Sequence, residues 1–180
     1  MFENLKLTSL SISILVYLAR SPGKQYYQRE IARELNSSVG GCHKVLKELR
    51  RKGLVKSFKR GKNSYYTINE ENPSIKYFKI FTNIQELNDI IEKIKSTSRK
   101  IILFGSCAEG MDTLESDIDI LVIAEDVEGL RDELLGKFVN GRRIRPIIKA
   151  PHEYMKLKNR DRALYNEIEG GLVLWRKSDE

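Results

Sequence analysis

The sequence is poor in cysteine and has no long apolar run, and these absences exclude several classes of protein. Its two cysteines, Cys42 and Cys107, lie far apart and form no Cys-x-x-Cys pair, so neither a disulfide framework nor a zinc knuckle is indicated. No apolar run approaches the ~18 residues that a membrane-spanning helix needs. The first ten residues, MFENLKLTSL, have neither the basic start nor the small-residue cleavage site of a signal peptide, so we expect a cytoplasmic protein that does not contact the membrane.

Acidic charge is also scarce, but only in the first part of the chain. Residues 1–72 contain 14 Lys/Arg and 6 Asp/Glu, a net charge of +8, whereas residues 73–180 contain 18 and 19, a net charge of −1. A basic excess confined to one part favours a polyanionic partner for that part. The alternative is an ordinary basic surface in contact with water. The 180 residues are enough for two small domains.

Residues 1–72 have the pattern of three short helices and a hairpin. Helical spacing of apolar residues predicts a first helix before the Ser-Pro-Gly at 21–23, a second near 28–35, and a third from the N-cap Ser38 to about Lys52. Gly40 and Gly41 in the first turn of the third helix either let the backbone approach a phosphate or mark an irregular start. The segments on either side of Gly-Lys-Asn at 61–63 predict a two-stranded hairpin.

The polar face of the third helix and the hairpin tip are the candidate DNA-binding residues. A helix of this kind enters the major groove with its N-terminal residues near the base edges, while contacts to phosphates supply most of the affinity. The stretch VLKELRRKGLVKSFKRGKNSYYTIN at 45–69 resembles winged helix-turn-helix transcription regulators, which implies a DNA-binding domain over residues 1–72. A winged helix that binds only protein is the alternative. The expected DNA contacts are Ser38, His43, Lys44, Lys47, Lys59, Arg60, Lys62 and Asn63.

Residues 73–97 predict one long connecting helix. Asn72 and Pro73 form a typical helix start, and apolar residues recur at helical spacing from 75 to 94, which corresponds to ~33 Å of helix. The apolar positions are broader than one small domain needs. The helix is therefore expected to pack on both domains or on a second copy in a homodimer, the alternative being a buried connecting helix.

Residues 98–180 alternate between strand and helix patterns. Strands are predicted near 100–105, 117–126, 142–149 and 172–175, and helices over 128–141 and around 152–168. This pattern predicts a small mixed-sheet α/β domain whose helices lie mainly on one face of the sheet. The whole chain is thus expected to be α+β, with a winged helix-turn-helix, a connecting helix and this C-terminal domain.

The stretch GSCAEGMDTLESDIDILVI at 105–123 contains the residues with the clearest chemistry. Gly105 and Ser106 end a strand and open a helical turn, where a glycine backbone and helix-start N–H groups favour an anion such as phosphate. Asp117 and Asp119 alternate along a strand, so their carboxylates point the same way about 6–7 Å apart. Two such groups can converge on a hard cation such as Mg²⁺, which bridges triphosphate oxygens.

This motif closely resembles the signature of the DNA polymerase β-like nucleotidyltransferase superfamily, specifically its minimal nucleotidyltransferase proteins, over residues 98–175. The resemblance implies that Gly105 and Ser106 bind nucleotide phosphates, with Gly110 and Ser116 in the same loop, and that Asp117 and Asp119 are catalytic and hold Mg²⁺ or Mn²⁺. It implies a nucleoside triphosphate as donor, with ATP the preferred candidate. Minimal members often act as antitoxins, so the resemblance also implies a HEPN-type toxin or another protein as acceptor or partner.

The sequence departs from this family at the third carboxylate, which active members carry on the next strand. The expected place falls near Arg145 or Pro146, and neither can bind Mg²⁺. Proline removes a hydrogen-bond donor from the sheet and so suggests an edge strand. Glu153 is the nearest acid downstream. Arg142, Arg143 and Arg145 either contact a triphosphate or acidic partner or form a charged strand edge exposed to water.

Two functions are consistent with these features. The first is metal-dependent transfer of a nucleotidyl group from a nucleoside triphosphate to a hydroxyl acceptor by a DNA-binding protein, which retention of the Gly-Ser pair and both aspartates favours. The second is a transcriptional regulator whose C-terminal domain binds a nucleotide or a partner protein without catalysis, which the missing carboxylate favours.

Overall fold

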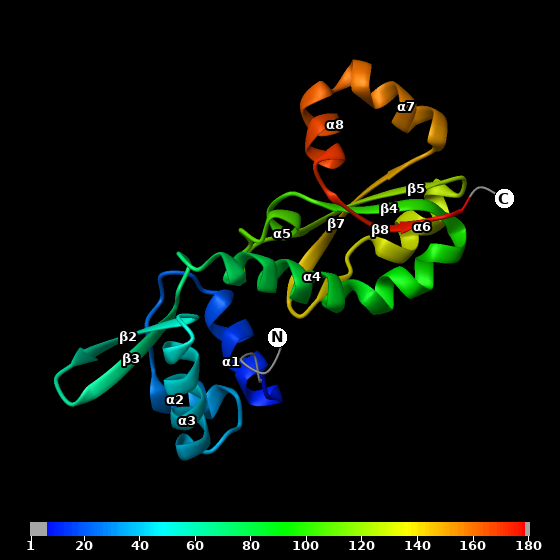
Figure 1. Cartoon of the computed structure of the whole chain (residues 1–180). Helices are drawn as coiled ribbons and strands as arrows, with labels where there is room; N and C mark the ends of the chain where they lie inside the picture. Colours follow the sequence, from blue (N-terminus) through cyan, green and yellow to red (C-terminus); the bar gives the residue numbers. More distant parts are fainter. Residues whose placement is uncertain (1–6, 179–180) are drawn as a thin grey trace. The chain divides into compact units, whose positions relative to one another are not determined.

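A computed structural model describes residues 7–178 of the chain (Figure 1). The chain divides into two compact units, Met1–Tyr77 and Phe78–Glu180. Both units contain helices and a sheet, which confirms the α+β class. In the part of the chain that is described, no helix is both long and apolar enough to cross a membrane.

The three predicted helices of the first unit are present. They are α1 Ser9–Ala19, α2 Gln28–Glu34 and α3 Val39–Arg51. Two of them begin at side-chain caps, because the Ser11 N–H donates to Thr8 Oγ1 at 3.2 Å and the Gly41 N–H donates to Ser38 Oγ at 3.0 Å. Apolar side chains from all three helices fill one buried core: Ile14, Leu15, Leu18, Ile31, Leu46 and Leu49.

The predicted hairpin follows these helices. β2 Val55–Arg60 pairs antiparallel with β3 Asn63–Ile68, and Gly61 and Lys62 form the two-residue turn between them. The short strand β1 Tyr26–Tyr27 pairs with the other side of β3, which gives the order β1-β3-β2. Three helices and this hairpin make the first unit a winged helix-turn-helix.

The long helix α4 spans Pro73–Ile94, as the sequence predicts. The Ser74 N–H donates to Asn72 Oδ1 at 3.0 Å, and Pro73 stands in the first turn, where a missing N–H costs little. A short 3₁₀ turn, η2 Lys95–Thr97, follows the helix. Leu87 and Ile94 of α4 are buried in the core of the second unit.

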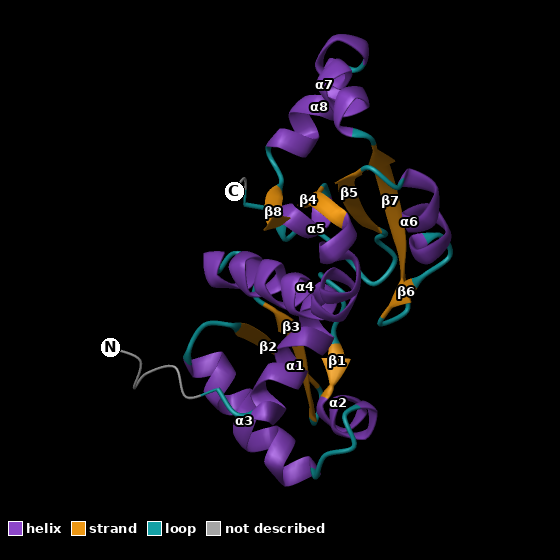
Figure 2. Cartoon of the chain, turned by 90° about the vertical axis from the view of Figure 1, so that its right-hand side faces the viewer, coloured by secondary structure: helices purple, strands orange, loops and turns teal. Residues whose placement is uncertain are grey.

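A five-stranded mixed sheet forms the centre of the second unit (Figure 2). Its strands lie in the order β6-β7-β5-β4-β8. β5 and β7 run parallel, and the other neighbouring strands pair antiparallel. The strands are β4 Ser98–Phe104, β5 Ile118–Ala124, β6 Phe138–Val139, β7 Arg142–Lys149 and β8 Leu172–Arg176.

Helices cover both faces of this sheet. α4 and α6 Val127–Leu134 pack on Ile101 and Leu103 of β4, whereas α7 Pro151–Arg160 and α8 Arg162–Glu169 pack on Ile102 and Phe104. The expectation of helices mainly on one face is therefore incomplete. Because successive residues of a strand point to opposite faces, the unbroken apolar run of β4 needs cover on both.

The helix predicted over residues 128–141 is shorter in the structure. α6 ends at Leu134, and β6 pairs with the start of β7 through a turn at Asn140 and Gly141. Both turn residues have positive φ, +50° and +81°, as two-residue hairpin turns with Asn-Gly require. Asn140–Gly141 is thus the turn of a hairpin. The prediction that the helix continues to residue 141 is wrong, because it followed the apolar spacing past Leu134.

Candidate functional site

The Gly-Ser loop lies between β4 and β5 and begins with a turn in which Gly105 has positive φ. Gly105 has φ +66°, and its carbonyl accepts hydrogen bonds from the Ala108 and Glu109 N–H groups of α5 Ser106–Glu109. A Cβ at Gly105 would lie 3.1 Å from Asp119 Oδ2 and 3.5 Å from Glu167 Oε1. Glycine is required here both by the left-handed backbone and by the close carboxylates.

The two aspartates lie at the start of β5, beside this loop. Asp119 pairs across the sheet with Phe104, the residue before Gly105, and Asp117 immediately precedes the strand. Their side chains are half-buried, 24% and 38% exposed respectively. The structure therefore brings Gly105 and the two aspartates together, as the sequence predicts.

Arg145 occupies the place where a third carboxylate was expected. In the parallel pairing of β5 with β7, Arg145 stands directly opposite Asp119. Its Nε lies 3.8 Å from Asp117 Oδ2 and its Nη1 lies 3.6 Å from Asp119 Oδ1. One guanidinium thus bridges the two aspartates, but it is 63% exposed and its contacts are long. The neighbouring Pro146 is tolerated because β6 pairs only with the first residues of β7.

The surroundings of Asp119 act on its pKa in opposite directions. Burial raises the pKa of Asp119 above its ordinary value, the charge of Arg145 lowers it, and the charge of Asp117 raises it again. Burial is the largest influence, so the net direction is upward. An aspartate that is costly to ionise is one that gains from a nearby cation.

Glu167 is a third carboxylate at this site that sequence reasoning missed. It lies on α8 and, with Asp119 and Arg145, lines a cavity of about 360 Å³ whose remaining walls are mostly apolar. The remaining lining residues are Phe104, Pro146, Ile147 and Leu164. The only sequence signal for Glu167 is that it follows Leu164 by one helical turn, since residues three apart share a helix face.

The other predicted site residues have mainly structural contacts. Ser106 is the first residue of α5, and Gly110 ends that helix in a left-handed conformation. Ser116 Oγ accepts a hydrogen bond from the Thr113 N–H at 2.9 Å and so closes the turn before Asp117. Glu153, the acid considered as a substitute, instead caps α7, because its Oε2 accepts from the Ala150 N–H at 3.1 Å.

A buried cluster of charged side chains holds this loop against α4 and β7. Arg142 is 3% exposed and donates to Asp112 Oδ2 at 3.0 Å, to Glu86 Oε2 at 2.7 Å and to Asn83 Oδ1 at 3.0 Å. Asp112 is fully buried and also accepts from Asn83 Nδ2 at 3.0 Å, while Lys79 donates to its main-chain oxygen. The expectation that Arg142 forms an exposed strand edge is therefore wrong, since this charge is buried and paired.

The same cluster reaches the main chain of the aspartate pair. Arg142 Nη1 lies 3.4 Å from Cys107 Sγ, and the Cys107 thiol lies 3.5 Å from the Asp117 carbonyl oxygen. Cys107 is buried. It is a small spacer that connects the buried charges with the backbone at Asp117.

The aspartates have the donor chemistry of a site for a hard divalent cation. No cluster of three His, Cys, Asp or Glu side chains among residues 7–178 is placed to hold a metal ion. Mg²⁺ is nevertheless often held by one or two carboxylates, with phosphate oxygens and water completing its shell. The oxygens of Asp117 and Asp119, which here share the Arg145 guanidinium, are the ones that would hold Mg²⁺ or Mn²⁺.

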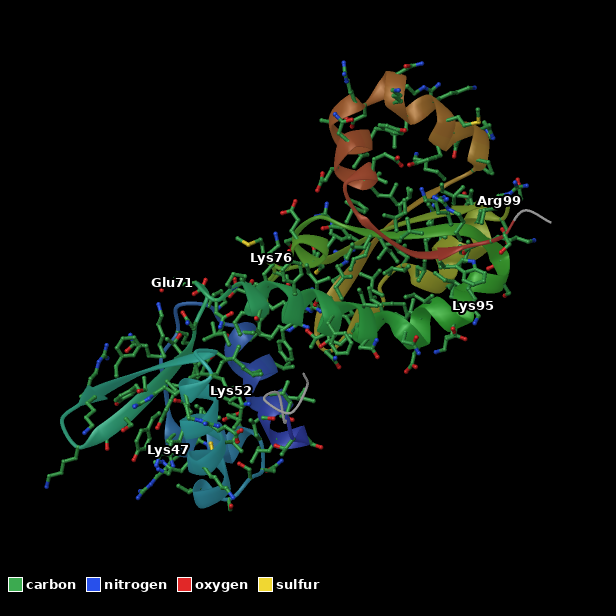
Figure 3. All side chains as sticks on the ribbon, viewed as in Figure 1. Lys47, Lys52, Glu71, Lys76, Lys95 and Arg99 are labelled. Atoms are coloured by element: carbon green, nitrogen blue, oxygen red, sulfur yellow. The ribbon has the colours of Figure 1, made fainter. Side chains whose placement is uncertain are left out.

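The predicted DNA-binding residues of α3 lie on its outward side. His43, Lys44 and Lys47 are exposed, and Lys47 is labelled on α3 in Figure 3. Ser38 caps the helix, and a Cβ at Gly41 would lie 2.9 Å from the Ser38 Oγ. Gly41 therefore makes room for the cap, which gives it a structural role at the start of α3.

The hairpin tip is basic and exposed as well. Lys59, Arg60, Lys62 and Asn63 are exposed, and Arg60 lies over the Tyr65 ring with its guanidinium carbon 5.5 Å from the ring centroid. Within the described residues, the lysines of this tip and of the outward side of α3 make no ion pair. Their charges remain free for an outside anion.

Two family models match the chain. One, described as "Rrf2: Iron-dependent Transcriptional regulator", matches residues 6–108, more than half of the sequence. The chain belongs to the Rrf2 family. The second, a nucleotidyltransferase domain, matches residues 84–169 of this Rrf2 protein. The chain thus joins a winged-helix regulator domain to a nucleotidyltransferase domain, as the two resemblances in the sequence indicate.

Solved structures similar to this Rrf2 protein are bacterial regulators, with low scores. A fragment of a "possible transcriptional regulatory protein" from Mycobacterium bovis is 23% identical, with a TM-score of 0.36 over 46% of this chain and 81% of its own. The adhesin competence repressor AdcR from Streptococcus pyogenes is 20% identical, with a TM-score of 0.41 over 53% and 70%. A Lactococcus lactis ZitR mutant in complex with DNA is 22% identical, with a TM-score of 0.40 over 52% and 64%. No curated protein matches the chain significantly.

The described residues do not fit the iron dependence named in the family description. The two cysteines are both buried, Cys42 in the first unit and Cys107 in the second. Residues 7–178 hold no group of three His, Cys, Asp or Glu side chains arranged for a metal ion. Within this part of the chain, the side chains therefore offer no site for an iron ion.

Proposed function

We propose that the chain is a DNA-binding transcriptional regulator whose nucleotidyltransferase domain binds a nucleoside triphosphate with a divalent cation but does not transfer the nucleotidyl group. The observation that carries this proposal is Arg145, which stands opposite Asp119 and bridges it to Asp117. The chain keeps Gly105, Asp117 and Asp119, the residues proposed to bind nucleotide and cation. Arg145 stands where active family members are expected to have the third carboxylate.

Charge and shape support the DNA-binding half. The winged helix presents exposed lysines on α3 and on the hairpin tip, and these have no carboxylate partner among the described residues. Lysine and arginine that are free of internal partners can neutralise DNA phosphates and release the counterions bound to them. Membership of the Rrf2 family of regulators supports the same role.

Geometry at Gly105 supports the nucleotide-binding half. Gly105 stands at the N-cap of α5 without a side-chain cap, and a glycine backbone at a helix start favours an anion such as phosphate. However, Asp117, Asp119 and Glu167 surround the site against one guanidinium. Three carboxylates repel a triphosphate, so nucleotide binding requires a cation between the carboxylates and the phosphates that neutralises the charge of both. Asp117 and Asp119 would hold that cation, and ATP is the preferred nucleotide.

Arg145 is the reason to expect no turnover. The third carboxylate of an active enzyme assists the metal or takes the proton from the acceptor hydroxyl. A guanidinium stays protonated in proteins and has no lone pair to accept that proton or to bind a metal. Its charge also competes with a metal ion for the two aspartates.

The test measures binding and transfer separately on the full chain. ATP binding is followed by equilibrium dialysis with Mg²⁺ or with a chelator, for the unsubstituted chain, for Asp117→Asn/Asp119→Asn, and for Asp132→Asn as an exposed control on α6. We expect Mg²⁺-dependent binding that only the double variant loses. Binding that persists in the double variant would refute the role of the aspartates.

Nucleotidyl transfer is the second candidate, and Glu167 is the observation that favours it. Its Oε1 lies beside Gly105 and faces the same cavity as Asp119, so it is the carboxylate placed to accept a proton from an acceptor hydroxyl. Incubation with α-labelled ATP, Mg²⁺ and protein acceptors, including a HEPN-type toxin, tests this. Labelling that disappears in Glu167→Gln and in the double aspartate variant would replace the first proposal with this one.

A further inference from the structure

A pair of side chains joins the starts of α2 and α3 on the DNA-binding face. Gln28, the first residue of α2, donates from Nε2 to the Val39 carbonyl oxygen at 3.2 Å. Its Oε1 lies 2.9 Å from Nδ1 of His43, in the first turns of α3. Gln28 therefore connects the backbone at the start of α3 with the ring of an exposed histidine.

The chemistry of these three groups fixes which ring nitrogen of His43 carries the proton. The Val39 carbonyl oxygen can only accept, so it selects the amide nitrogen of Gln28 and turns Oε1 toward the ring. Oε1 in turn can only accept, so it requires a proton on Nδ1. In the neutral imidazole, Nε2 is then an acceptor, and it has no hydrogen-bond partner within residues 7–178.

An acceptor at this place distinguishes bases in the major groove. The N-terminal residues of a recognition helix contact base edges, and His43 lies beside the exposed Lys44. Adenine N6 and cytosine N4 are amino donors in the major groove, whereas guanine offers N7 and O6 and thymine offers O4, all of which are acceptors. A ring nitrogen without a proton pairs with the first two bases and repels the other two.

We infer that Gln28 is a positioning residue that sets the base preference of this regulator, because it presents His43 Nε2 as an acceptor for adenine or cytosine. The inference rests on the proposed DNA binding. It assigns Gln28 a role in specificity, although Gln28 itself contributes no charge and does not need to touch DNA. Without Gln28 the ring can carry its proton on either nitrogen, and the contact then admits all four bases.

The test is a selection of bound sequences from a randomised DNA duplex library with the full chain. The variants are Gln28→Met, Gln28→Ala as a second truncation, His43→Ala, and Lys62→Ala on the hairpin as a control. Circular dichroism checks that each variant keeps its helices. In the unsubstituted chain we expect one position at which adenine or cytosine is favoured about three- to tenfold, the discrimination that one hydrogen bond supplies.

Each outcome bears on the inference. Both Gln28 variants are expected to admit guanine and thymine at that position and His43→Ala to lose the preference, whereas Lys62→Ala should weaken all sequences equally. Base preferences that are unchanged in the Gln28 variants, or kept in His43→Ala, would overturn the inference while leaving DNA binding intact. Failure of the unsubstituted chain to bind any duplex would instead refute the proposed DNA-binding function, and the inference with it.

Discussion

Replacement of Arg142 by methionine should strongly destabilise the second unit, although Arg142 lies outside the cavity. The guanidinium is 3% exposed and donates to Asp112, Glu86 and Asn83. Methionine has a similar length but no donor, so the substitution removes one partner of a buried ionic cluster without creating a large void. The remaining groups must then stay buried without their main partner.

The loss of folding free energy in Arg142→Met depends on the hydrogen bonds and ion pairs that Asp112 and Glu86 keep. Asp112 keeps the hydrogen bond from Asn83 and the ion pair with Lys79, whose Nζ lies 3.7 Å from Asp112 Oδ1. Glu86 is 15% exposed and recovers part of its hydration. Breaking a buried pair from one side typically costs 3–5 kcal/mol, and the retained partners place this case near the middle, at about 4 kcal/mol.

The assay is urea unfolding of the full chain, followed by the fluorescence of its single tryptophan. Trp175 lies in β8 of the second unit and therefore reports on that unit. With an m-value of about 2 kcal/mol per molar urea, Arg142→Met should lower the unfolding midpoint by roughly 2 M.

Arg145→Met is the matched control, with the same substitution three residues later on the same strand. Arg145 is 63% exposed and its contacts with the aspartates are 3.6 and 3.8 Å long, so its removal should cost less than about 1 kcal/mol. Similar midpoints for the two variants would refute the reasoning, because burial would then not separate the two arginines.

Three further predictions concern the glycine turn, the aspartate pair and the hairpin. Gly105→Ala should abolish ATP binding in equilibrium dialysis, whereas Gly136→Ala should not. Both glycines have positive φ, but only at Gly105 would an added Cβ lie 3.1 Å from a carboxylate oxygen. Loss of ATP binding in both variants would point to backbone strain alone. Burial raises the pKa of Asp119 in the folded protein, so ionisation of Asp119 destabilises the fold as the pH rises from the ordinary aspartate range through this raised pKa. Asp119→Asn should therefore raise the melting temperature at pH 7, and the gain should shrink as the pH falls toward the ordinary aspartate range. A lower melting temperature at pH 7 would contradict this. Lys62→Ala should weaken DNA binding and reduce the slope of log affinity against log salt by about 0.9, the share of one phosphate contact, and an unchanged slope would exclude that contact.

The sequence was sufficient for the three helices and the hairpin of the first unit because their signals are local, whereas the short strand β1, which pairs with the distant β3, was missed. The apolar stripe of α3, the cap at Ser38 and the Gly61 turn each specify an element within a few residues. The long helix α4 was equally clear from its Asn-Pro start and its apolar spacing. The error over residues 128–141 arose where a local signal, Asn140–Gly141, was outweighed by apolar spacing.

The sequence by itself also determined the candidate nucleotide site, since Gly105, Asp117 and Asp119 lie close together along the chain and strand alternation places both carboxylates on one face. Only the tertiary structure decided what surrounds them. Register between β5 and β7 put Arg145 opposite Asp119, and packing of α8 on the sheet brought Glu167 to the same cavity. Burial turned Arg142 from an apparent surface charge into the centre of an ionic cluster. Pairing and burial depend on contacts between residues far apart in the chain, and a single sequence does not specify which distant residues will meet.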